Sequence, residues 1–285
     1  MLYLYGKFVD IVVYNSAFPV SGIMLTHKIT SGSMKSNTAE LPESLTILIN
    51  FLENVQEIDS DKLTTFLKSI EMRSADYLPF NYFDHPVNES YGRNKISEGR
   101  NYSIFLMSWA PGDFTAIHSH GLSDWGAVCF FGDTTHRLYK ADGNRIELVQ
   151  KGIVPAGTVV PVTGNLVHAM GNMGDNPIMS LHIYGSDNSL SNANDDSEIY
   201  EIEKHRVSTT NGSAFLNSED KFIKKWEKGI VSNSETISDY FEIIKTYYSR
   251  NKIVHMADYI DLILRKPELF SLEPSPLKED IQIIL

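Results

Sequence analysis

The chain of 285 residues has a single cysteine, Cys129, and is poor in positive charge. One cysteine excludes an intrachain disulfide and indicates a reducing compartment, so a cytoplasmic location is expected. Cys129 stands in an apolar run, where a small buried hydrophobe is expected rather than a nucleophile. Lys and Arg number 25 against 36 Asp and Glu, a formal net charge of -11. A chain with this charge is not expected to bind nucleic acid or an anionic membrane surface.

Long apolar runs are missing as well. The sequence has no run of about 18 apolar residues, so no transmembrane helix is expected. Residues 1–20 are apolar but interrupted by Lys7, Asp10 and Asn15, and they lack a basic start followed by a clean apolar block. This segment does not have the pattern of a signal peptide. Internal repeats and low-complexity tracts are also absent.

The length permits one domain with extensions. We expect an N-terminal extension to which the sequence assigns no role, a main domain, and a C-terminal helical extension, at residues 1–40, 41–215 and 216–285. Apolar spacing predicts helices at residues 43–58, 61–72, 222–228, 234–248 and 253–264. Short strands dominate between these groups, with a hairpin turn at 141–144 and a polar loop at 187–197.

Two histidines lie two residues apart in Gly-Asp-Phe-Thr-Ala-Ile-His-Ser-His at 112–120. Residues two apart in a strand point to the same face, so His118 and His120 are expected to project side by side. A turn signal, Ala-Pro-Gly-Asp, precedes them. Imidazole is the commonest protein ligand for transition metals, so the pair indicates a divalent metal site. The alternative is a chance pair.

The surrounding residues resemble the first cupin motif. Gly112, His118, His120 and Gly132 stand at its spacings, and Trp125 stands where the motif has a glutamate. Most metal cupins bind through three histidines and that glutamate. This chain cannot supply the carboxylate from its usual position.

The segment at 161–172 resembles the second cupin motif and supplies a third histidine, His168. The resemblance implies a mainly β fold: a cupin double-stranded β-helix, or jelly-roll barrel, at about residues 100–205, flanked by the N- and C-terminal helices. It also implies a metal site formed by His118, His120 and His168. Turn residues punctuate short apolar runs here, as is typical of a small barrel: Gly152, Pro155, Gly157, Pro161 and Gly164.

Three neutral imidazoles leave the charge of a dipositive metal uncompensated, so such a site favours an anionic ligand such as a thiolate. Three protein ligands on one face of an octahedron leave three positions for substrate and dioxygen. This arrangement resembles that of non-haem iron oxygenases, with histidine in place of the usual carboxylate.

Among cupins, the chain resembles the cysteine dioxygenase (thiol dioxygenase) family over about residues 45–205. Tyr-Gly-Arg-Asn at 91–94 resembles the family's Tyr-x-Arg-Asn, and Ser-Leu-His-Ile-Tyr at 180–184 resembles its Ser-x-His-x-Tyr. Leu-Met-Ser-Trp-Ala-Pro-Gly at 106–112 resembles the strand that leads into the metal motif. Several segments in the right order are far more specific than one His-x-His.

The resemblance implies roles for these residues. Arg93 would hold the substrate carboxylate, and Tyr91 and Tyr184 would hydrogen-bond near substrate and oxygen. His182 with Ser180 would orient Tyr184. The implied cofactor is Fe(II), and the implied reaction adds both atoms of dioxygen to the sulfur of L-cysteine or a similar small thiol, giving a sulfinate.

The same residues can be interpreted without the family. A guanidinium such as that of Arg93 matches a carboxylate through two parallel hydrogen bonds, whereas most arginines form surface salt bridges. Ser180, His182 and Tyr184 alternate with two apolar residues, so one strand face is polar. That face lines either a barrel interior, where it needs hydrogen-bond partners, or the solvent.

Trp125 is the main departure from the family pattern. In animal members a cysteine at this position is cross-linked to the tyrosine that matches Tyr184, so Tyr184 is expected to be a free phenol here. The indole either reshapes the pocket, and with it the choice of substrate, or packs in the barrel wall. We therefore expect Trp125, like Ser180, to lie around the site without contacting the metal.

Two other functions stay open: an iron oxygenase acting on a different thiol or amino-acid derivative in a biosynthetic pathway, and a cupin binding module without turnover. A monomer, or a homodimer formed through the C-terminal helices, is expected. The remaining histidines have no partner at ligand spacing and are expected to be satisfied or solvated: His27, His85, His136, His205 and His255.

Overall fold

The computed structural model describes residues 40–187, 193 and 195–266. The expected N-terminal extension, apart from its last residue, and part of the expected loop at 187–197 lie outside these residues. The described chain opens with two helices, α1 (Glu43–Asn54) and α2 (Ser60–Ser69). Both were predicted, but both end earlier than the apolar spacing indicated.

The early ends of α1 and α2 have local causes. The backbone becomes extended at Val55, with φ -73° and ψ 132°. Asp59 then caps α2, because its carboxylate accepts a hydrogen bond of 2.7 Å from the backbone N–H of Lys62. The backbone is extended again at Ile70. Apolar residues beyond these points pack from non-helical backbone, which periodicity alone does not distinguish from helix.

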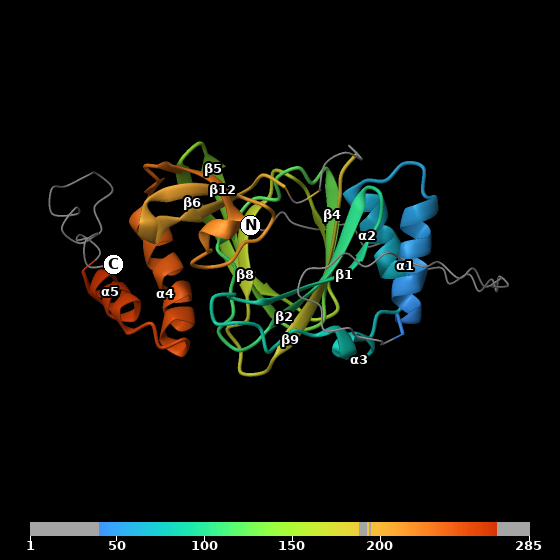
Figure 1. Cartoon of the computed structure of the whole chain (residues 1–285), viewed down its shortest axis with the longest axis horizontal. Helices are drawn as coiled ribbons and strands as arrows, with labels where there is room; N and C mark the ends of the chain where they lie inside the picture. The colour runs from blue at the N-terminus through green and yellow to red at the C-terminus, as the bar shows by residue number, and fades with distance from the viewer. Residues whose placement is uncertain (1–39, 188–192, 194, 267–285) are drawn as a thin grey trace. The chain divides into compact units, whose positions relative to one another are not determined.

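The strands form two sheets (Figure 1). The five-stranded sheet has, in spatial order, β1 (Gly92–Glu98), β2 (Tyr102–Trp109), β9 (Ile178–Gly185), β4 (Trp125–Phe130) and β7 (Val159–Val162). The eight-stranded sheet has β12 (Ile223–Lys228), β11 (Arg206–Thr210), β10 (Ser197–Glu201), β3 (Ile117–His118), β8 (Val167–Gly171), β5 (Thr134–Asp142), β6 (Arg145–Val154) and β13 (Val231–Ser232). The predicted mainly β, double-stranded β-helix fold is confirmed.

Alternation along the strands divides the core into layers. On β2, Phe105 and Met107 belong to the apolar cluster between the two sheets, whereas Ile104 and Leu106 belong to the cluster under α1 and α2. Every residue of β2 is buried, because both faces of the strand are covered. The inward face of the barrel is therefore set by the strand register.

Two C-terminal helices cover the outer face of the eight-stranded sheet: α4 (Ser234–Arg250) and α5 (Val254–Arg265). Figure 1 shows them on the side of the barrel away from α1 and α2. Aromatic and branched side chains of α4, among them Tyr240 and Phe241, pack on Ile117 and Tyr139 of the sheet in one cluster. The C-terminal helices thus bury the outer face of this sheet in a second apolar layer.

The prediction of a helix at 222–228 is wrong. This segment is the edge strand β12, preceded by the 3-10 turn η3 (Asp220–Phe222), and it pairs antiparallel with β11. From Lys224 to Lys228 its side chains are exposed, so neither face provides the one-sided apolar pattern from which strands are recognised. The sheet extends to Ser232, beyond the boundary expected at residue 215.

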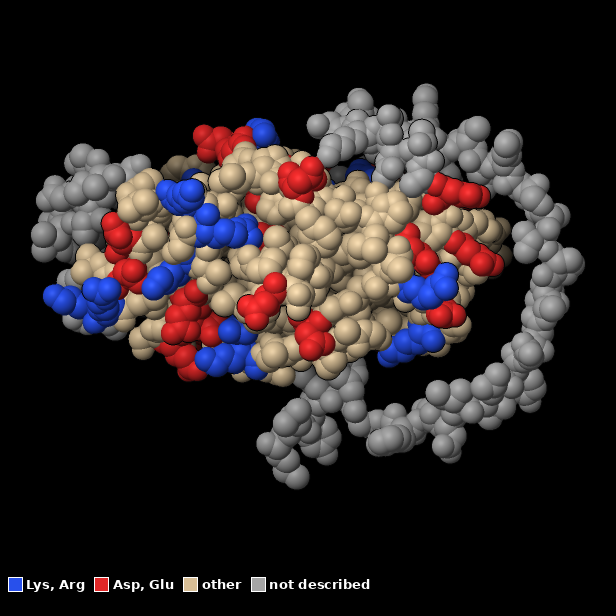
Figure 2. Space-filling view, turned by 90° about the horizontal axis from the view of Figure 1, so that it is seen from below, with Lys and Arg blue, Asp and Glu red and all other residues tan. Residues whose placement is uncertain are grey.

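Other local expectations are met. The turn predicted at 141–144 joins β5 to β6, with Asp142 opposite Arg145 and Gly143 in the left-handed region at φ 59°. Among the described residues, no helix is long and apolar enough to cross a membrane. On the face shown in Figure 2, acidic and basic side chains are interspersed. Short helical turns complete the fold: α3 (Ser74–Tyr77), η1 (Leu78–Phe80) and η2 (Ile202–Lys204).

Candidate metal centre

Three buried histidines, His118, His120 and His168, converge at the cavity between the sheets, and His118 and His120 line it. His118 ends β3, His120 follows two residues later, and His168 lies on β8 directly opposite His118 in the β3–β8 pair. Their candidate ligand atoms all lie within 4.8 Å of one another. The fold therefore brings together the three histidines that the sequence singled out.

In His118 and His120, one ring nitrogen is hydrogen-bonded to a backbone carbonyl oxygen. Nδ1 of His118 lies 2.9 Å from the carbonyl oxygen of Ala116, and Nδ1 of His120 lies 3.3 Å from that of Leu166. A neutral imidazole that donates from Nδ1 keeps a lone pair on Nε2. Nε2 of His120 and Nε2 of His168 are buried and lack a hydrogen-bond partner in the described part of the chain. Because buried polar atoms are rarely left unpaired, these residues fit a metal ion that takes the lone pairs.

The pKa values of the three histidines also favour metal binding. Burial lowers the pKa of His118 to about 4. Burial and the neighbouring imidazoles hold the pKa values of His120 and His168 well below the ordinary value. All three rings are thus neutral at pH 7, the form in which histidine binds metals.

A fourth histidine, His136, contacts the trio. It lies on β5, and its Nε2 is 2.7 Å from Nδ1 of His168. Burial, and to a lesser degree His118 and Arg137, lower its pKa to about 4, so it too is neutral. The expectation that His136 is a satisfied histidine is met, but its partner is a candidate metal ligand. The contact depends on the pairing of β5 with β8, which no local pattern reveals.

The polar row predicted on one strand is a hydrogen-bonded chain inside the barrel. Oγ of Ser180 lies 2.8 Å from Nε2 of His182, and Nδ1 of His182 lies 2.8 Å from the hydroxyl of Tyr184. Trp109 extends the chain, because its Nε1–H donates to Oγ of Ser180 at 2.9 Å. The sequence had placed Trp109 only on the strand leading to the metal motif. The solvent-facing alternative for this row does not hold.

The donor chemistry of Trp109 fixes the direction of the hydrogen bonds from Trp109 to Tyr184. The indole of Trp109 can only donate, so the hydrogen of Ser180 has one acceptor, Nε2 of His182. The opposite arrangement would leave a buried hydroxyl hydrogen without an acceptor, which is costly. His182 therefore carries its proton on Nδ1 and donates it to Tyr184. The hydroxyl hydrogen of Tyr184 is then available to the cavity.

Neither His182 nor Tyr184 carries a charge near pH 7. Burial raises the pKa of Tyr184, and Tyr91 adds to the shift, so the phenol stays protonated. Burial, His118 and Arg93 lower the pKa of His182 to about 3. The pair is suited to hydrogen bonding at the cavity wall.

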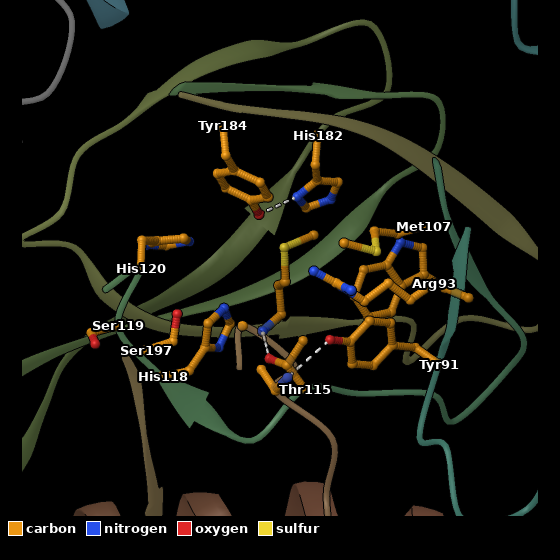
Figure 3. A pocket seen from close by; sticks show the side chains of 14 residues that line it. Tyr91, Arg93, Met107, Thr115, His118, Ser119, His120, His182, Tyr184 and Ser197 are labelled. Atoms are coloured by element: carbon orange, nitrogen blue, oxygen red, sulfur yellow. Dashed lines mark hydrogen bonds between the residues drawn. The ribbon is translucent and has the colours of Figure 1, made fainter. Parts of the chain in front are cut away.

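Arg93 lies across the cavity from the histidines (Figure 3). Its guanidinium carbon is 3.9 Å from the centre of the Phe105 ring, which supports it from one side. No carboxylate of the described residues forms an ion pair with Arg93, so the surface salt-bridge alternative does not hold. Burial lowers its pKa, but a guanidinium remains charged at pH 7. An unpaired cation in an enclosed site favours an anionic ligand.

Tyr91 stands beside Arg93. Its ring stacks on Trp109 at 4.9 Å, and its hydroxyl oxygen accepts a hydrogen bond of 3.2 Å from the backbone N–H of Ala214. Because the oxygen accepts there, its own hydrogen can be donated into the cavity. Burial raises the pKa of Tyr91, which keeps that hydrogen in place.

The cavity that these residues enclose is small, about 30 Å³. This is room for roughly two or three water molecules, which favours a small ligand. Figure 3 shows His118 and His120 on one side, Tyr91 and Arg93 on the other, and His182 and Tyr184 between them. Two of the three candidate metal ligands, His118 and His120, therefore share this space with the predicted substrate-binding residues Tyr91 and Arg93.

Comparison with known families agrees with this geometry. The model of one family, cysteine dioxygenase type I, matches residues 31–197, more than half of the chain. The chain belongs to the cysteine dioxygenase type I family.

Solved structures similar to this cysteine dioxygenase family member include several cupins. A Klebsiella pneumoniae protein with a double-stranded β-helix domain is 17% identical, with 42% of this chain and 93% of that one covered and a TM-score of 0.31. An RmlC-like cupin from Desulfovibrio desulfuricans is 17% identical, with 40% of this chain and 97% of that one covered and a TM-score of 0.30. Bacillus subtilis oxalate decarboxylase, solved in a study of its Mn(II) centres, is 18% identical, with 37% of this chain and 25% of that one covered and a TM-score of 0.28.

The expectation that Trp125 surrounds the site requires correction. Trp125 does not line the cavity; its indole is buried in the cluster under α1 and α2, against Gly185. The next residue, Gly126, is the one paired with Tyr184, and a Cβ there would lie 3.4 Å from the Tyr184 ring. In this cysteine dioxygenase family member a glycine therefore faces Tyr184. Gly126 has no thiol to form the cross-link, so the expectation of an uncross-linked Tyr184 stands.

The other histidines lie away from the cavity. Nε2 of His85 is 3.0 Å from a carboxylate oxygen of Asp113, which is fully buried in the turn before the metal-binding strand. His205 adopts left-handed backbone at φ 51°, and His255 is exposed on α5. His27 lies outside the described residues. None of the described three contributes a ligand atom.

Proposed function

We propose that this cysteine dioxygenase family member is a non-haem Fe(II) thiol dioxygenase that converts L-cysteine or a similar small thiol to its sulfinate. One observation carries the proposal. The imidazoles of His118 and His120 line one cavity together with the unpaired guanidinium of Arg93, and His168 lies beside them, with the ligand atoms of the three histidines within 4.8 Å of one another. A cavity with these groups can receive a metal, a thiolate and a carboxylate together.

His118, His120 and His168 would hold the metal, which is Fe(II) in this proposal. Bound Fe(II) would supply a common site for thiolate and dioxygen, and would activate dioxygen. Because the three ligands are neutral, an anionic thiolate compensates the metal charge better than a neutral ligand does. The absence of a protein carboxylate among the ligands thus suits a thiol substrate.

Arg93 and Tyr91 would orient the substrate. The guanidinium of Arg93, stacked on Phe105, would bind the carboxylate through two hydrogen bonds. Tyr91, held by the backbone of Ala214, would donate its hydroxyl hydrogen beside it. Tyr184 would donate from the other wall, because His182 occupies its oxygen as a donor. Holding the reactants in place in this way lowers the barrier to reaction.

The proposed reaction needs no external reductant. The thiol sulfur loses four electrons on becoming a sulfinate, and dioxygen gains these four. Two sulfur–oxygen bonds form, the oxygen–oxygen bond breaks, and the thiol proton is released. The proposed partners are thus the thiol and dioxygen alone.

The alternatives receive less support. The tailoring reaction on a different substrate was motivated partly by an indole in the pocket, and Trp125 points elsewhere. A binding module without turnover does not require the hydrogen-bonded chain from Trp109 to Tyr184 in addition to the metal site and Arg93.

Oxygen uptake by the iron-loaded chain tests the proposal. Cysteine, 3-mercaptopropionate, cysteamine and homocysteine form the substrate panel, and mass spectrometry with isotopically labelled dioxygen follows the product. The expected result is a sulfinate that contains both labelled oxygen atoms, with cysteine the leading substrate. No uptake with any of the four would contradict the proposal and favour the tailoring reaction.

A further inference from the structure

The third candidate ligand differs from the other two in what holds it. Nδ1 of His118 and Nδ1 of His120 face backbone carbonyls, whereas Nδ1 of His168 faces the imidazole of His136 at 2.7 Å. We infer that His136 is a positioning residue, which accepts a hydrogen bond from His168 and aims Nε2 of His168 at the metal. This inference rests on the proposed function, because it requires that His118, His120 and His168 bind a metal ion.

Only one arrangement of protons permits metal binding. A neutral His168 that binds through Nε2 must carry its proton on Nδ1. Nε2 of His136 must then be the acceptor in the 2.7 Å contact, and the proton of His136 lies on its own Nδ1. If His136 donated instead, the proton of His168 would lie on Nε2, which would then be a buried donor without a partner.

The sheet holds His136 firmly in place. β5 lies between β8 and β6, with Leu138 opposite His168 and His136 opposite Met170. Residues two apart share a strand face, so His136 and Leu138 point to the side that His168 occupies. Arg137, between them, points to the opposite face, where its Nε lies 2.7 Å from a carboxylate oxygen of Asp239 on α4. The C-terminal helix therefore anchors the strand that presents His136.

An imidazole acceptor also affects the ligand. Hydrogen bonds to the distal nitrogen of a ligating histidine fix its ring orientation and raise its basicity, and their loss typically weakens metal binding. His136 is partly exposed, whereas His168 is buried. His136 thus joins the most enclosed part of the site to the outer part of the barrel.

The affinity of the full-length chain for Co(II), measured by competition with a chelator, tests this role. His136→Phe keeps a ring but cannot accept the hydrogen bond, and it should weaken Co(II) binding about 10- to 100-fold. His136→Gln, whose side-chain oxygen can accept, should recover most of the affinity. His255→Phe, a change at an exposed histidine of α5, should bind Co(II) like the unmutated chain.

Two results would overturn this inference alone: Co(II) binding by His136→Phe as tight as that of the unmutated chain, or equal losses in the Phe and Gln variants. Equal losses would mean that the native imidazole serves only packing. Failure of the unmutated chain to bind Co(II) would overturn both this inference and the proposed function. Intact Co(II) binding without thiol oxidation would contradict the proposed function alone.

Discussion

The indole of Trp109 and the hydroxyl of Ser180 share a hydrogen bond of 2.9 Å that runs in one direction only. Since Trp109 cannot accept, Ser180 donates to His182, and His182 in turn donates to Tyr184. The geometry thus assigns a tautomer to His182 and a donor role to Tyr184, and both assignments are measurable.

The first prediction concerns this tautomer. In the chain loaded with Zn(II), which is diamagnetic, nitrogen NMR should find the proton of His182 on Nδ1. Ser180→Ala removes the donor to Nε2, so the proton should move toward Nε2 and Tyr184 should donate to Nδ1 instead. Because Tyr184 then no longer donates into the cavity, kcat should fall about tenfold or more.

Ser180→Thr keeps the hydroxyl and serves as the matched control, with the tautomer of the unmutated chain. The resonance is assigned by its absence in His182→Gln. An Nε2-protonated His182 in the unmutated chain would disprove the derived direction.

The second prediction concerns metal loading. Nε2 of His120 is buried without a partner in the described part of the chain, so removal of this ring deletes a candidate ligand and breaks only the 3.3 Å contact of Nδ1 with the carbonyl oxygen of Leu166. His120→Ala should therefore contain almost no iron after purification and reconstitution, while its circular dichroism spectrum matches that of the unmutated chain. Iron content would be measured by mass spectrometry, with His255→Ala as the control. Equal iron in His120→Ala and the unmutated chain would remove His120 from the ligand set.

The third prediction separates substrate binding from stability at Arg93. Lysine keeps the charge but loses the two-pronged fit to a carboxylate. A charged hydrogen bond contributes about 1.5–3 kcal/mol, so Arg93→Lys should lower kcat/KM for cysteine about 10- to 100-fold. Its Tm should change little, because Arg93 has no ion-pair partner among the described residues.

Cysteamine, which lacks a carboxylate, provides the internal control for Arg93. Its kcat/KM should be nearly the same in the Lys variant and in the unmutated chain. A parallel loss for cysteine and cysteamine would show that Arg93 does not read the carboxylate, and unfolding of the variant would show a structural role.

The fourth prediction concerns pH and stability. Oε2 of Glu203 accepts a hydrogen bond of 2.7 Å from Tyr240, and Oε1 is buried without a partner among the described residues. Burial, with a contribution from Glu201, raises the pKa of Glu203. A raised folded-state pKa gives stability that is fully present below the unfolded value, about 4.3, and is lost as pH rises through the folded value. Glu203→Gln should therefore unfold at higher denaturant concentration than the unmutated chain at pH 8, but not at pH 4.5.

Glu201 offers the opposite case two residues away. Burial acts to raise its pKa, but hydrogen bonds from Arg206, Lys204 and Ser208 outweigh burial and lower it. The stability that Glu201 contributes is present above its pKa in the unfolded chain and is lost as pH falls through its pKa in the folded chain. Glu201→Gln should cost about 3 kcal/mol at pH 7. Denaturant melts of both variants at several pH values would show whether the two slopes have opposite signs.

Those parts of the site that depend on local spacing could be predicted from the sequence. His118 and His120, and the row from Ser180 to Tyr184, need only the two-residue period of a strand. His168 and Arg93 came from motif resemblance. His136 could not be found in this way, because its contact depends on the pairing of β5 with β8.

Register explains the other differences. The motif spacing placed Trp125 beside Tyr184, but the pairing of β4 with β9 puts Gly126 there. A shift of one residue along a strand turns the side chain to the opposite face, so the indole lies outside the barrel. The edge strand Ile223–Lys228 lacked a buried face, and its apolar residues matched helical spacing equally well.

The last prediction concerns this register. Because the indole of Trp125 packs under α1 and α2, its replacement should affect stability and not the choice of thiol. Trp125→Ala should cost about 3–5 kcal/mol of unfolding free energy. Trp125→Phe should cost less, since it keeps a ring and removes a buried Nε1–H that has no partner in the described chain. The ratios of kcat/KM for cysteine, 3-mercaptopropionate, cysteamine and homocysteine should match those of the unmutated chain.

Gly126→Ala provides the contrast to Trp125→Phe, because its methyl group would lie 3.4 Å from the Tyr184 ring and 2.6 Å from the carbonyl oxygen of Ile183. The close approach to a backbone atom should shift β4 against β9 and move Tyr184 relative to the metal. Gly126→Ala should therefore alter the thiol ratios and lower kcat, whereas Trp125→Phe should do neither. If oxygen-uptake assays instead showed changed ratios in Trp125→Phe and unchanged ones in Gly126→Ala, the indole would face the pocket and the register of β4 would be wrong.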